Sequence, residues 1–72
     1  MEYLESFESS SISWAGYDPK KKVLHVQYVE NDYTYEYSNV PLKKWKELKA
    51  AESKGQYINF YIKPFHDYEK YK

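Results

Sequence analysis

Lysines and tyrosines are the residues whose types and spacing could carry chemistry in this chain. All eleven cationic residues are lysine, and eight of them stand in the C-terminal half. Five of these eight are candidates for binding phosphates: Lys43, Lys46, Lys49, Lys54 and Lys63. Lysine ammonium groups bind nucleic-acid phosphates and release counterions, so this set predicts a surface for a phosphate backbone. Arginine, whose planar fork binds phosphates and bases in a bidentate manner, is absent, so binding is expected to be salt-sensitive and poor in sequence specificity. The alternative is a helix face that is only solvated.

Tyrosine is the second candidate, because aromatic rings on a sheet face can stack on bases. The chain has ten tyrosines, and three of them alternate at period two along one predicted strand: Tyr33, Tyr35 and Tyr37. The alternative is that these rings pack beneath the helices. A chain of 72 residues favours that alternative, because so small a core needs every large ring. Tyr37 and Tyr57 are the two tyrosines predicted to stack on bases.

The remaining groupings point away from catalysis. Ser53-Lys54-Gly55 could receive a phosphate at a helix start, or could form a corner between two helices. His25 and His66 lack the spacing of a metal site, and cysteine is absent. The sequence has no P-loop, nucleophile elbow or HExxH motif. It therefore predicts a protein that is not an enzyme and has no catalytic residues, no metal site and no cofactor.

Three strands are expected to position the tyrosines. Apolar and polar residues alternate over residues 12–16, with Ile12 and Trp14 on one face. The same period of two continues over residues 23–28 and 33–37. Consecutive strands joined by short turns predict an antiparallel β meander.

Two short helices are expected to position the lysines. Leu42, Trp45 and Leu48 recur every three residues, and Ser53 begins a capping box before a second apolar run that ends at Pro64. The predicted fold class is α+β, with a three-stranded antiparallel β meander followed by two short helices packed on one face. The predicted core consists of Ile12, Trp14, Leu24, Val26, Tyr35, Leu42, Trp45, Leu48, Ile58 and Ile62.

Length and charge predict how the chain is organised. We expect a flexible acidic segment over residues 1–8 and a single domain over residues 9–72. Residues 1–36 hold three lysines against seven acids, whereas residues 37–72 hold eight lysines against four acids, so a neutral chain can still carry a basic face. The absence of a long apolar run and of a signal peptide predicts a cytoplasmic protein with no membrane partner.

Several short motifs, taken in order, resemble the KTSC domain family, named after the C-terminus of some lysyl-tRNA synthetases. They include Gly16-Tyr17-Asp18-Pro19, Tyr35-Glu36-Tyr37 and Ser53-Lys54-Gly55, with Tyr68 closing the pattern. The resemblance runs from about Ser9 to Tyr68. It implies the fold of a small α+β domain, and the synthetase connection implies RNA as a ligand.

Two functions from different classes follow from these observations. The first is a small non-catalytic accessory protein that binds RNA or another single-stranded nucleic acid through its lysines. The alternative is a protein-interaction module that binds another protein or itself. As a homodimer it would use exposed tyrosines or a sheet edge.

Overall fold

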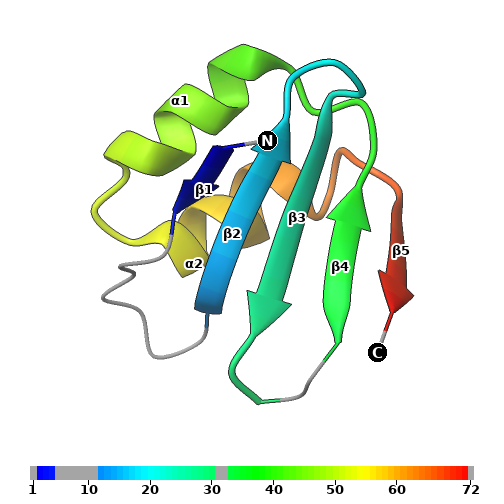
Figure 1. Ribbon diagram of the computed structural model, residues 1–72. Coiled ribbons are helices and arrows are strands. Elements are labelled where there is room, and N and C mark those ends of the chain that lie inside the picture. The colour runs from blue at the N-terminus through cyan, green and yellow to red at the C-terminus, as the bar shows by residue number, and fades with distance from the viewer. Residues whose placement is uncertain (1, 5–11, 31–32, 72) are drawn as a thin grey trace.

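The computed structural model describes residues 2–4, 12–30 and 33–71. An antiparallel sheet of five strands, in the order β1-β2-β3-β4-β5, carries the helical segments behind it in the view of Figure 1. The strands are β1 (Glu2–Leu4), β2 (Ile12–Asp18), β3 (Val23–Tyr28), β4 (Thr34–Tyr37) and β5 (Tyr68–Tyr71). The helical segments are α1 (Leu42–Ala50), α2 (Lys54–Tyr57) and the π-helical turn η1 (Ile58–Ile62). The α+β class is therefore confirmed.

The prediction of three strands is wrong, because both ends of the chain add a strand to the sheet. The sequence predicts a flexible segment over residues 1–8, yet Glu2–Leu4 pair with β2 as β1. Residues 1 and 5–8 of that segment lie outside the described residues. The tail supplies β5, which pairs with β4. Every residue of β5 is exposed, and its sequence Tyr68-Glu69-Lys70-Tyr71 lacks the alternation of apolar and polar residues from which strands are predicted.

The second predicted helix exists but is divided in two. Ser53 caps it as expected, since its hydroxyl oxygen accepts the backbone N–H of Gln56 at 3.4 Å. After four residues the helix widens, and the N–H of Lys63 donates to the carbonyl of Ile58 at 2.9 Å, five residues earlier. Turns of this π type are rare and are often found at functional sites.

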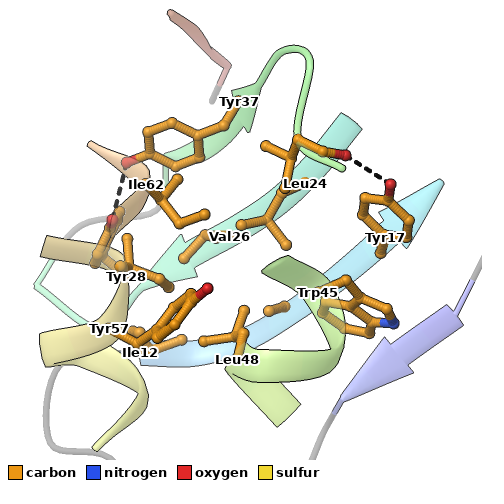
Figure 2. Close-up of a cluster of buried hydrophobic side chains, with 13 residues drawn as sticks. Ile12, Tyr17, Leu24, Val26, Tyr28, Tyr37, Trp45, Leu48, Tyr57 and Ile62 are labelled. Carbon is orange, nitrogen blue, oxygen red and sulfur yellow. Dashed lines mark hydrogen bonds between the residues drawn. The ribbon is translucent and has the colours of Figure 1, made fainter. Parts of the chain in front are cut away.

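The core lies between the sheet and the helical segments, as Figure 2 shows. Seven of the ten predicted core residues are fully buried: Ile12, Leu24, Val26, Trp45, Leu48, Ile58 and Ile62. Tyr35 packs against this cluster while partly exposed. Buried tyrosines keep their hydroxyls paired. The Tyr17 hydroxyl donates to the Val40 carbonyl at 2.6 Å, and those of Tyr28 and Tyr37 bond to each other at 2.9 Å.

Trp14 is not in the core, because a β-bulge interrupts β2. Ile12 pairs with Tyr28, whereas Trp14 pairs with Gln27, so Ser13 is an extra residue with no partner in β3. The bulge reverses the alternation, so Ile12 faces the core and Trp14 faces the opposite side of the sheet. There the Trp14 indole N–H donates to the Gln27 side chain at 2.7 Å.

Leu42 is the other wrong core prediction, since 44% of it is exposed. A spacing of three residues advances about 300° around a helix, so each step drifts by about 60°. Leu42 and Leu48 therefore point about 120° apart, on either side of Trp45. The helix buries Trp45 and Leu48, and Leu42 turns toward solvent.

Candidate nucleic-acid interface

The first helix carries three of the predicted phosphate-binding lysines, but they have different surroundings. Lys43 and Lys46 are exposed and border a shallow hollow on the outer surface of α1. The ammonium of Lys49 instead lies 3.2 Å from the Glu2 carboxylate on β1 and 5.6 Å above the Trp45 ring. The indole N–H of Trp45 and, after it, Lys49 hold the pKa of Glu2 below its ordinary value. Lys43 and Lys46 are thus better placed than Lys49 to meet a phosphate.

The other two predicted lysines lie on different elements. Lys54 folds back onto the end of α1 and donates to the Ala51 carbonyl at 3.0 Å. Ser53, Lys54 and Gly55 form the corner between α1 and α2, which is the structural alternative considered above. Lys63 follows η1 and places its ammonium 5.0 Å from the centre of the Tyr28 ring. The five predicted lysines therefore do not form one continuous surface.

A different set of lysines joins Lys43 and Lys46. The turn between β2 and β3 holds Lys20, Lys21 and Lys22, all exposed. The backbone N–H of Val40, two residues before α1, donates to the Lys22 carbonyl at 2.8 Å and fixes the turn beside the start of the helix (Figure 1). We call this set the basic surface, composed of Lys20, Lys21, Lys22, Lys43 and Lys46.

The turn of the basic surface is shaped by Asp18. One oxygen of its carboxylate accepts the backbone N–H groups of Lys20 at 3.0 Å and Lys21 at 3.2 Å. The N–H of Lys21 is the main cause that lowers the pKa of Asp18, so this carboxylate is ionised at neutral pH. Lys22 then adopts a left-handed backbone conformation with φ of 56°, which completes the reversal into β3. Counting charge by halves of the sequence missed this contribution, since the turn lies in the acidic half.

Neither tyrosine predicted to stack on bases has an accessible ring. Tyr37 is 1% exposed, and its hydroxyl bonds to that of Tyr28. Tyr57 is 8% exposed, and its hydroxyl donates to the Glu47 carboxylate at 2.6 Å. Burial raises the pKa of both hydroxyls. Both rings belong to the core, so the prediction that they stack on bases is wrong.

Lys44 is a structural lysine that sequence reasoning did not single out. Its ammonium donates to the Tyr61 carbonyl at 2.8 Å, contacts His66 Nε2 at 2.9 Å and lies 4.8 Å from the centre of the Phe65 ring. His66 Nδ1 lies 3.0 Å from the Ser38 carbonyl, which places the imidazole proton on Nδ1 and leaves Nε2 to accept from Lys44. This arrangement ties α1 to the segment that leads into β5.

His66 should make the stability of the fold depend on pH. Burial and the neighbouring Lys44 lower its pKa from the ordinary value of 6.5, because both disfavour the imidazolium. Below pH 6.5 the unfolded chain therefore binds more protons than the folded protein, and the free energy of unfolding should fall as pH drops through the lowered pKa. Urea unfolding at pH 7.5 and 5.5 measures this decline. His66→Gln should flatten it, and His25→Gln should retain it; an unchanged slope in His66→Gln would contradict the assignment.

Two further features bear on the class of site. In the described residues, no group of three or more histidine or acidic side chains is arranged to hold a metal ion. Within the same part of the chain, no helix is both long and apolar enough to cross a membrane.

Comparison with known proteins identifies the family. The family model described as the KTSC domain matches residues 8–68. This chain belongs to the KTSC domain family. The crystal structure of a KTSC domain protein from Yersinia pestis is similar to it, with a TM-score of 0.87 and 31% identity, over 97% of this chain and 99% of the other.

Relatives of this KTSC domain occur both as small proteins and as part of a larger one. A protein from Tsukamurella paurometabola is 39% identical, over 85% of this chain and 90% of its own length. An uncharacterized protein from Stutzerimonas stutzeri is 34% identical, over 85% of this chain and 84% of its own. A lysine–tRNA ligase from a Nostoc species is 38% identical over 88% of this chain, which corresponds to 11% of the ligase.

Proposed function

We propose that this KTSC domain is a small, non-catalytic, cytoplasmic accessory protein that binds RNA through its basic surface. The observation that carries the proposal is the hydrogen bond between the Val40 N–H and the Lys22 carbonyl. It fixes the turn with its three lysines beside the start of α1, the helix that carries Lys43 and Lys46. No ion pair joins any of these five ammonium groups to a carboxylate of the described residues. Lys21 is near enough to Asp18 to help lower the pKa of that carboxylate. The other four can meet phosphates without first giving up an ion pair with a described carboxylate.

RNA is favoured over other polyanions by the similarity to a lysine–tRNA ligase, whose name gives tRNA as its substrate. The chemistry of the basic surface also limits what it can read. Lysine is a point charge without the planar fork that reads bases, and the two tyrosines predicted to stack are buried. The expected mode is contact with the phosphate backbone, with low sequence preference.

The salt dependence of binding tests this proposal. If the five lysines each contact a phosphate of a single-stranded RNA, log K should fall with log salt at a slope of about −3.5. The double variant Lys43→Gln/Lys46→Gln should reduce that slope by about 1.4 and weaken binding at low salt. Fluorescence anisotropy with a labelled single-stranded RNA, matched DNA and heparin measures all three ligands.

The matched control removes the same charge elsewhere. Lys63→Gln/Lys70→Gln deletes two lysines that lie above tyrosine rings, outside the basic surface, and should leave the slope within about 0.5 of the unaltered protein. Equal loss in both double variants would contradict the assignment of the basic surface. Equal affinity for RNA and heparin would contradict RNA as the ligand.

A further inference from the structure

Four tyrosine rings from three adjacent strands meet on the covered face of the sheet. Tyr28 comes from the end of β3, Tyr35 and Tyr37 come from β4, and Tyr68 begins β5. Together with Glu30 and Lys63 they line a cavity of about 210 Å³. We call these six residues the tyrosine cage.

The rings of the cage include one nearly parallel pair, since Tyr35 and Tyr37 lie within 18° of each other with centres 6.3 Å apart. The other rings are set at larger angles. Those of Tyr28 and Tyr35 are perpendicular, with centres 5.0 Å apart. The Tyr68 ring is tilted by 38° to that of Tyr35 at 5.2 Å and by 49° to that of Tyr37 at 5.7 Å. Tyr68 is 53% exposed and forms the open side. Since the face of each ring carries partial negative charge, rings set at these angles around a cavity favour a cation inside it.

The two most buried hydroxyls of the cage are already used within the protein. The hydroxyls of Tyr28 and Tyr37 bond to each other, and no buried side-chain nitrogen or oxygen of the described residues lacks a partner. Burial raises the pKa of Tyr28, so its hydroxyl stays neutral. Tyr28 and Tyr37 are only 9% and 1% exposed, so a ligand would meet mainly the rings of Tyr35 and Tyr68. Ring faces suit a cation that has no N–H groups to satisfy.

The structure already places one cation against the cage. The Lys63 ammonium lies 5.0 Å from the centre of the Tyr28 ring, and the π-helical turn η1 brings the Lys63 backbone to this position. Lys63 is itself exposed, so its flexible side chain can move into water. Glu30, the one carboxylate among the lining residues, adds negative charge at the same cavity.

We propose that the tyrosine cage binds a quaternary ammonium group, with Lys63 as the cation that occupies its edge when no ligand is bound. A lysine ammonium is strongly hydrated and gives up favourable contacts with water on entering an aromatic site. A trimethylammonium carries the same charge, but its methyl groups keep water away from it. It also needs no hydrogen-bond partner, so ring faces and a carboxylate are sufficient. Trimethyl-lysine and choline share this chemistry.

Titration of the full chain with small probes tests the cage. The tyrosine ring signals in NMR should shift in a saturable way with tetramethylammonium, choline and trimethyl-lysine. Choline should bind about tenfold or more tightly than 3,3-dimethylbutanol, its uncharged analogue of the same shape. Trimethyl-lysine should likewise bind more tightly than unmethylated lysine. The ratio of the trimethyl-lysine and choline affinities distinguishes the two sources of the group.

Variants separate the cage from a general effect of charge. Lys63→Ala removes the internal cation and should tighten choline binding by about two- to fivefold. Tyr68→Ala removes the ring at the open side of the cage and should weaken choline binding by at least two- to fivefold. Tyr71→Ala is the matched control, because Tyr71 is an exposed tyrosine of the same strand on the opposite face of the sheet. It should leave the affinity unchanged.

Three results would overturn the proposal. The first is equal binding of choline and its uncharged analogue. The second is the same loss of affinity in Tyr68→Ala and Tyr71→Ala. The third is a shift of the cage signals by a 5′-nucleotide but by none of the ammonium probes, which would assign the cavity to a stacked base.

Discussion

Replacing Trp45 with alanine is expected to unfold a large share of the protein at 25 °C. The side chain is 1% exposed and stacks on Tyr17 with ring centres 5.6 Å apart. Its indole N–H donates to the Glu2 carboxylate at 2.8 Å. Removing a buried tryptophan costs about 3–5 kcal/mol, while a chain of this length has a total free energy of unfolding of about 4–11 kcal/mol.

Circular dichroism against urea measures the effect of Trp45→Ala. The matched control is Phe60→Ala, which also truncates a large aromatic ring on the helical side but at a position that is 65% exposed. That change should alter the free energy of unfolding by about 0.5 kcal/mol or less. If both variants unfold at the same urea concentration, α1 does not pack on the sheet as described.

Deleting Ser13 from β2 should be tolerated, whereas deleting Ala15 from the same strand should not. Ser13 is the extra residue of the bulge, so its removal lets Ile12 and Trp14 alternate regularly while each keeps its own face. Deleting Ala15 instead moves Trp14 into the place of Ala15, whose small side chain is fully buried in the core. The surroundings fit a methyl group, so this overpacking should cost about 3 kcal/mol or more.

Thermal unfolding of the two deletions decides the matter. The Ser13 deletion should stay within about 1.5 kcal/mol of the unaltered protein, since no buried side chain is lost or displaced. The Ala15 deletion should give no cooperative transition, or one at a much lower temperature. A Ser13 deletion that is as damaging as the Ala15 deletion would show that the bulge supports the sheet in its own right.

The parts of the fold that depend on local pattern could be predicted from the sequence. Leu24 and Val26 follow a period of two and are buried, and Trp45 and Leu48 follow a helical spacing and are buried. The bulge at Ser13 was not predicted, because a residue is recognised as unpaired only when the register with the neighbouring strand is known. The strand β5 was not predicted because a fully exposed edge needs no alternation.

The candidate sites depend on long-range contacts and were harder to predict. The lysines of α1 were recognised, but Lys20 to Lys22 join them only through the backbone bond from Val40 to Lys22. The tyrosine cage takes its rings from three strands, one of them the strand that sequence analysis missed. Lys63 was predicted to bind phosphate, and its contact with Tyr28 depends on the π turn, which leaves no periodic signal.

Strand β5, the last strand of the sheet, also bears on whether two copies can join edge to edge. When two identical strands pair antiparallel in one sheet, facing residues must share a face, so their numbers sum to an even value. If the pairing is centred on the middle of β5, this rule places Glu69 opposite Glu69 of the second copy, or Lys70 opposite Lys70. Like charges directly opposite each other repel. The C-terminal edge therefore resists both a continuous ten-stranded dimer and the stacking of strands that leads to fibrils.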